Sequence, residues 1–123
     1  MRALLFLVFS AGVLTAEMPV QLAPPSATTK SNPLENDDSA RKAGAKLFAR
    51  ECAACHGENA QGLGKAPSLR QPEVYDAAPG VLFWVITNGS IYKRMPSFAH
   101  LPEPQRWQLV AFLRSLNARK PAP

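Results

Sequence analysis

The chain has 123 residues, of which 46% are hydrophobic and 19% are charged, and its formal net charge is +5. This length and composition predict one small globular domain and exclude an intrinsically disordered chain. The lysines and arginines are scattered and no nucleic-acid-binding motif accompanies them, so the positive charge indicates an acidic partner surface or solubility, not nucleic acid.

Residues 1–16 have the pattern of a secretory signal peptide. Arg2 precedes an apolar run that is interrupted only by Ser10 and Thr15 and is short for a membrane span. Small residues at the end of this run offer a cleavage site, and cleavage would remove Arg2 and lower the charge from +5 to +4 (5 − 1). We therefore expect export to the periplasm. The alternative is an uncleaved segment that tethers the protein to the membrane.

The segment 17–36 contains four prolines among serine, threonine and glutamine residues, without apolar periodicity. This composition predicts an extended or disordered linker. The domain proper is then expected over residues 37–120.

The first long helix is predicted to begin at Asp37, Asp38 or Ser39, since each can cap a helix N-terminus. Small and apolar residues then recur at helical spacing, at Ala43, Gly44, Leu47 and Phe48. Glycine within a helix is disfavoured by about 1 kcal/mol relative to alanine. We therefore expect Gly44 to allow another helix to approach closely.

The run Cys52-Ala53-Ala54-Cys55-His56 predicts covalent attachment of a c-type haem. Two thiols can add across the haem vinyl groups, and an imidazole on the same side can bind the iron. Positions i, i+3 and i+4 of a helix lie on one face, so one turn would bring Cys52, Cys55 and His56 together.

Other uses of the only two cysteines fit this pattern less well. A disulfide does not account for the histidine that follows. A zinc site with Cys52, Cys55 and His100 needs four well-placed ligands, and adjacent Cys55 and His56 are awkward for one metal. A thioredoxin-like redox pair lacks the expected βαβ pattern.

The irregular stretch after His56 contains Gly57, Gly62 and Gly64, which permit the chain to curl around a ligand. A metal-ligating histidine usually donates its other ring N–H to an oxygen. The carbonyl of Pro67 is our candidate for that acceptor.

A second helix is predicted over Pro79 to Thr87, with Pro79 at its start and Asn88-Gly89 at its end. The loop that follows carries Met95 before Pro96. A lone methionine usually fills a core, but a haem with one histidine needs a sixth ligand, so we predict Met95 as that ligand. His100 is the alternative, and we expect it to lie at the surface.

The last helix is predicted from Glu103 or Gln105 to Asn117. Its apolar residues recur at i, i+3, i+4 and i+7, at Leu109, Phe112, Leu113 and Leu116. We expect this helix to cross the first long helix at Gly44.

Together these residues resemble the class I cytochrome c family. The matching motifs occur in family order: Gly44 with Phe48, Cys52-x-x-Cys55-His56-Gly57, Pro67-x-Leu69, Asn88-Gly89, Met95-Pro96, and Trp107 with Phe112-Leu113. The chain departs from the family at Phe112, where tyrosine is common, and at Pro102, where a hydroxyl cap is common.

The resemblance implies an all-α cytochrome c fold around one covalent haem c. It implies thioether bonds at Cys52 and Cys55 and axial iron ligation by His56 and Met95. It implies a one-electron carrier, or alternatively a dedicated cytochrome subunit of a periplasmic dehydrogenase or oxidase complex. A haem enzyme or sensor with an open sixth position is a third reading.

Basic residues flank the two loops that should border the haem, at Lys65, Arg70, Lys93 and Arg94. We expect them either to form a docking ring for an acidic redox partner or to be unrelated surface charge.

Overall fold

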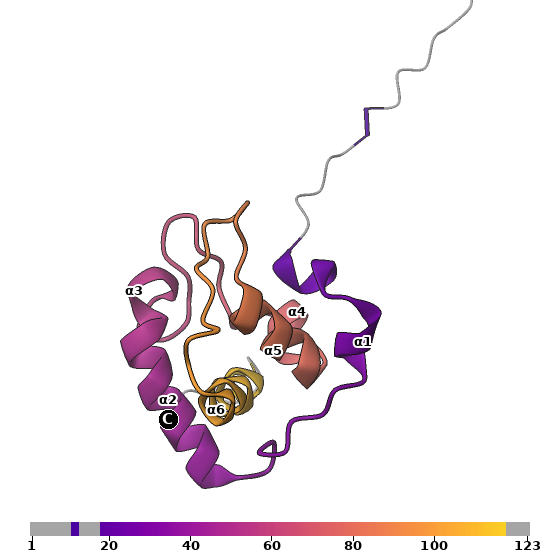
Figure 1. Cartoon of the computed structure of the whole chain (residues 1–123). Helices are drawn as coiled ribbons and strands as arrows, with labels where there is room; N and C mark the ends of the chain where they lie inside the picture. The colour runs from indigo at the N-terminus through magenta and orange to yellow at the C-terminus, as the bar shows by residue number, and fades with distance from the viewer. Residues whose placement is uncertain (1–10, 13–17, 118–123) are drawn as a thin grey trace, which may run out of the picture.

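The computed structural model describes residues 11–12 and 18–117, and Figure 1 shows the arrangement of its helices. In chain order these are η1 (Pro19–Leu22), α1 (Pro25–Thr28), α2 (Asp38–Glu51), α3 (Ala53–His56), α4 (Pro72–Tyr75), α5 (Pro79–Asn88) and α6 (Glu103–Arg114). The described residues contain helices and two isolated bridges but no strand.

The N-terminal signal peptide predicted over 1–16 lies outside the described residues, except for positions 11 and 12, and so does the domain end at 118–120. Among the helices that are described, none has the length and apolarity needed to cross a membrane.

Helices α2 and α6 cross and form the most extensive helix–helix contact of the fold. Asp37 caps α2, because its carboxylate accepts hydrogen bonds from the backbone N–H groups of Ser39 at 2.8 Å and Ala40 at 3.1 Å. At the crossing, a Cβ on Gly44 would collide with the carbonyl of Gln108. The rings of Phe48 and Phe112 meet there, with centroids 5.2 Å apart. The predicted crossing at Gly44 is thus confirmed.

Helix α5 completes the core against α6. The ring of Phe83 stacks on Trp107, with centroids 4.0 Å apart and planes inclined by 22°. Pro79 is among the first residues of α5 and Gly89 follows its end, as the sequence predicted. The largest fully buried side chains of the described fold are Phe48, Leu109 and Val110, so the core is centred between α2, α5 and α6.

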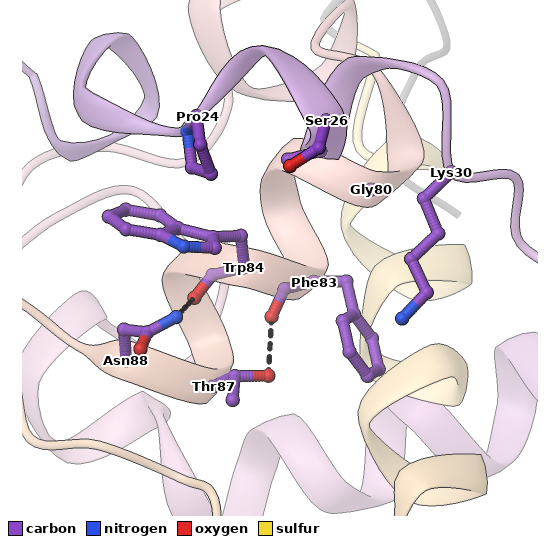
Figure 2. Close-up of a pocket in the computed structure, with 9 residues that line it drawn as sticks. Pro24, Ser26, Lys30, Gly80, Phe83, Trp84, Thr87 and Asn88 are labelled. Atoms are coloured by element: carbon purple, nitrogen blue, oxygen red, sulfur yellow. Dashed lines mark hydrogen bonds between the residues drawn. The ribbon is translucent and has the colours of Figure 1, made fainter.

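The expectation of an extended or disordered linker over 17–36 is wrong for residues 18–36, which form a strap across α5 and α6. Both short helices of the strap, η1 and α1, carry proline in their first turn and contact α5. A Cβ on Gly80 would collide with the carbonyl of Ala27, so the strap backbone lies directly on α5. Figure 2 shows the pocket between them, which is lined by Pro24, Lys30 and Trp84 among others and contains no predicted haem-site residue.

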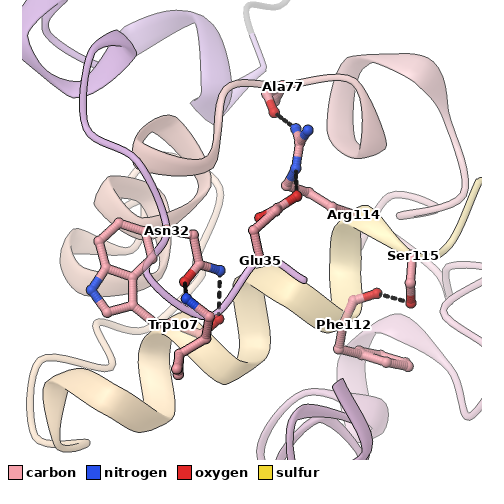
Figure 3. A network of polar contacts seen from close by, with 8 residues as sticks. Asn32, Glu35, Ala77, Trp107, Phe112, Arg114 and Ser115 are labelled. Atoms are coloured by element: carbon pink, nitrogen blue, oxygen red, sulfur yellow. Dashed lines mark hydrogen bonds and ion pairs between the residues drawn. The ribbon is translucent and has the colours of Figure 1, made fainter. Parts of the chain in front are cut away.

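Two polar contacts fix the rest of the strap to α6 (Figure 3). The buried Asn32 side chain donates to the carbonyl of Trp107 at 3.0 Å and accepts from the N–H of Leu34 at 2.8 Å. Glu35 pairs with Arg114, which also donates to the carbonyl of Ala77. These contacts hold the end of the strap against α6, while at its start the prolines of η1 and α1 begin short helices and do not keep the chain extended.

Candidate functional site

The cysteine–histidine motif occupies a separate turn after α2. Helix α2 ends at Glu51, and Cys52 leaves helical geometry with φ −123° and ψ −30°. Its carbonyl then accepts hydrogen bonds from the N–H groups of Cys55 at 3.2 Å and His56 at 3.0 Å. One turn therefore brings Cys52, Cys55 and His56 together, although it is not a continuation of the long helix.

Both thiols are free, with Cys52 half-buried and Cys55 exposed. Burial raises the pKa of the Cys52 thiol to about 12, and the nearby Glu51 and Cys55 add to the shift. This environment favours the neutral thiol over the thiolate. The described residues also contain no cluster of three or more His, Cys, Asp or Glu side chains suited to a metal ion.

The ring of His56 is oriented by one hydrogen bond. Its Nδ1 lies 3.0 Å from the carbonyl oxygen of Pro67. A carbonyl oxygen has no proton to donate, so Nδ1 must carry the hydrogen. The lone pair of the neutral imidazole is then on Nε2, the nitrogen that a metal would use.

The loop after His56 is folded back so that Pro67 reaches the imidazole. Gly57, Gly62 and Gly64 all have positive φ, between 53° and 88°. The N–H of Gly62 donates to the carbonyl of His56 at 2.7 Å, and the N–H of Leu69 donates to that of Ala60 at 2.8 Å. The loop is therefore closed by its own backbone.

Met95 is held by backbone contacts at the base of a tight turn. Its N–H and carbonyl exchange hydrogen bonds with Ser90, at 3.0 Å and 2.9 Å. Gly89 has φ +64°, and a Cβ there would lie 2.5 Å from the carbonyl oxygen of Met95. The Met95 side chain is partly buried against the hydrophobic core. The sequence signal for a turn was Asn88-Gly89, but the pairing of Ser90 with Met95 could not be seen in it.

His100, the alternative ligand, is exposed, as the sequence predicted. Its ring lies beside Phe98, with centroids 6.0 Å apart.

The basic residues of the predicted docking ring divide into two kinds. Lys65, Lys93 and Arg94 are exposed, whereas Arg70 is half-buried and donates to the carbonyl of Asn59. Apolar side chains stand beside the exposed ones: Ile91 and Tyr92 are each 92% exposed and Leu63 is 51% exposed.

The donor set suits a covalently attached haem. It combines two free thiols and an oriented neutral imidazole on one turn with a thioether on a separate, braced turn. A soft thioether and an imidazole are the usual axial ligands of a low-spin electron-transfer haem.

Comparison with known proteins gives the same class. Residues 39–113 match the family model described as cytochrome C oxidase, cbb3-type, subunit III. The chain is 38% identical over 86 residues to the quinohemoprotein alcohol dehydrogenase ADH-IIG of Pseudomonas putida. That match covers 68% of this chain but only 11% of the much longer dehydrogenase.

Two solved structures share the fold. Cytochrome CL from the marine methylotrophic bacterium Methylophaga aminisulfidivorans aligns with a TM-score of 0.62 and 27% identity, over 88% of this chain and 72% of that one. The KustC0563 c-type cytochrome aligns with a TM-score of 0.53 and 21% identity, over 60% of this chain and 96% of that one, which shows the fold alone.

Proposed function

Because the chain belongs to the cytochrome c oxidase, cbb3-type, subunit III family of c-type cytochrome domains, we propose that it is an exported one-electron carrier with a single covalent haem c. Its fold is the all-α cytochrome c fold and its role is electron transfer. Beyond the fold and the electron-transfer role, we propose which residues bind the haem, that the haem is attached covalently, that the protein is exported, and that it does not catalyse a reaction on a substrate.

The observation that carries the proposal is the hydrogen bond from His56 Nδ1 to the Pro67 carbonyl. An iron ligand needs its ring oriented and its lone pair on Nε2, and a hydrogen bond from Nδ1 supplies both. His56 is on the turn that also presents both thiols, and the bond ties this turn to the loop at Pro67, so attachment and ligation would share one local structure.

Each residue then has a defined task. Cys52 and Cys55 would hold the haem through two thioether bonds, each formed by addition of one S–H group across one vinyl group. His56 through Nε2 and Met95 through its sulfur would hold the iron, which would leave no open position for oxygen. The bound haem supplies the ferric/ferrous couple. The backbone hydrogen bonds between Met95 and Ser90 would keep this ligand in place in either oxidation state.

The decisive test is the absorption spectrum of the purified protein, with and without reductant. We expect a haem that organic solvent does not extract and, in the ferric state, a methionine–iron charge-transfer band. Met95→Ala should lose that band and His100→Ala should keep it. Retention of the band in Met95→Ala, or its loss in His100→Ala, would refute the ligand assignment and with it the bracing role of Ser90.

A second candidate function is a dedicated electron-transfer subunit or module of a periplasmic dehydrogenase or oxidase complex. It is favoured by the likeness to a short part of a quinohemoprotein alcohol dehydrogenase. Purification under mild conditions separates the two: a stable complex supports the subunit, and a monomer that reduces several acceptors supports the free carrier.

For either role we propose that Lys65, Lys93 and Arg94 steer an acidic redox partner to the exposed apolar side chains of Ile91 and Tyr92. No ion pair in the described part of the chain engages these three cations. Exposed charges accelerate encounter and are screened by salt. Electron-transfer rates that do not fall as salt is added would exclude this docking mode.

A further inference from the structure

The segment that carries Met95 is a long non-helical connection between α5 and α6. It leaves α5 after Asn88 and returns at Glu103. Near its far end, the Ser97 hydroxyl donates to the carbonyl of Thr87 at 2.6 Å, and the N–H of Phe98 donates to that of Ile86 at 2.9 Å. The segment therefore folds back onto the last turn of α5.

A single side chain of α6 contacts both ends of this connection. The Arg106 Nε donates to the carbonyl of Leu101 at 3.1 Å, just before α6 begins. Its Nη1 donates to the hydroxyl of Thr87 at 2.6 Å, in the last turn of α5. The guanidinium thus connects the point where the segment leaves with the point where it returns.

The partners of Arg106 are themselves fixed. The Thr87 hydroxyl, while accepting from Arg106, donates to the carbonyl of Phe83 at 2.7 Å, a bond drawn in Figure 2. The guanidinium carbon also lies 4.7 Å from the centre of the Phe83 ring, which stacks on Trp107. Only a planar, always charged fork can make two hydrogen bonds in different directions and also contact a ring face.

We propose that Arg106 is a positioning residue for Met95: by closing the 88–101 segment at both ends, it holds the methionine in place as the sixth ligand. The inference rests on the proposed function, because it concerns the ligand assigned there. A segment held at both ends has fewer conformations available without the methionine bond, so Met95 dissociates less often.

The test uses the haem-loaded protein and measures how readily added imidazole displaces Met95 from the ferric iron. Arg106→Gln removes the charge and the fork, and we expect an affinity for imidazole about tenfold higher, the size of effect given by loss of charged hydrogen bonds. The methionine–iron charge-transfer band should also weaken on mild warming. Arg106→Lys keeps the charge without the fork and should show an intermediate increase, which makes it the fallback if Arg106→Gln does not fold.

The matched control is Arg114→Gln, also on α6. Arg114 also hydrogen-bonds across elements, to Glu35 and Ala77, which lie outside the Met95 segment. Arg114→Gln should lower the melting temperature but leave the affinity for imidazole within about twofold of the wild type, as expected of independent sites.

Two outcomes would overturn the inference: unchanged affinity for imidazole in both Arg106 variants, or an equal rise in Arg114→Gln. Failure of the proposed ligand set looks different, because the wild-type protein itself would then lack the methionine–iron band.

Discussion

The helical frame and the loops that carry the site residues are stabilised by different means. In the frame, Phe48, Leu109 and Val110 are at most 2% exposed and interlock across α2 and α6. In the loops, Ile91 and Tyr92 are 92% exposed, and order comes from backbone hydrogen bonds such as those between Ser90 and Met95. Side-chain packing thus builds the frame, whereas backbone hydrogen bonds contribute more of the order in the loops.

The largest effect should come from removing the haem. The loops that carry its predicted ligands should lose their order first. A small domain such as this one has a thin core, and a covalent porphyrin would add a large apolar centre. We expect the double variant Cys52→Ser/Cys55→Ser to be poorly folded, with no cooperative thermal transition. Scanning calorimetry of this variant beside the holoprotein checks it, and an equally high cooperative transition in both would contradict the prediction.

Gly44→Val attacks the frame at the α2–α6 crossing. The new side chain would collide with the carbonyl of Gln108 and with the Cβ of Phe112 at 2.9 Å. Overpacking of this kind destabilises by about 3 kcal/mol, which urea denaturation of the holoprotein can measure. Ala49→Ser, on the exposed side of the same helix, should change the free energy of unfolding by less than about 0.5 kcal/mol.

Asn32→Ala tests whether the strap belongs to the frame. It removes the bond to the Trp107 carbonyl and leaves the Leu34 N–H without its acceptor, so the free energy of unfolding should fall by about 1–2 kcal/mol. The control Asn36→Ala removes an exposed amide of the same type. Equal stability of the two variants would mean that the strap contributes nothing measurable.

The smallest effect is expected at the start of α2. Asp37→Ala removes the carboxylate that accepts from Ser39 and Ala40, and loss of such a cap lowers stability by about 1 kcal/mol. Asp37→Asn keeps an acceptor in the same place and should retain most of that stability. Thermal unfolding of both variants decides between a capping role and a general charge effect.

Much of the fold was predictable from local patterns. The cap at Asp37, the helix from Pro79 and the apolar face of the last helix each depend on residues within one or two turns of each other. The close approach at Gly44 could be predicted because glycine is unfavourable within a helix unless its small size is needed for packing. The strap could not, because its prolines suggest an extended chain and its anchors are remote: Asn32 and Trp107 are 75 residues apart, and Glu35 and Arg114 are 79 apart.

By itself, the sequence determined the chemistry of the site. Two thiols and an imidazole within five residues can act together only by sharing one turn, so their spacing already predicted a haem-attachment motif at Cys52 to His56. The sequence also pointed to the Pro67 carbonyl as the partner of His56, which the structure places at 3.0 Å. Only the tertiary structure decided that Ser90 pairs with Met95 and that Arg106 joins the two ends of the methionine segment. Such contacts join polar groups of separate loops and helices, and no spacing within either partner's own sequence specifies them.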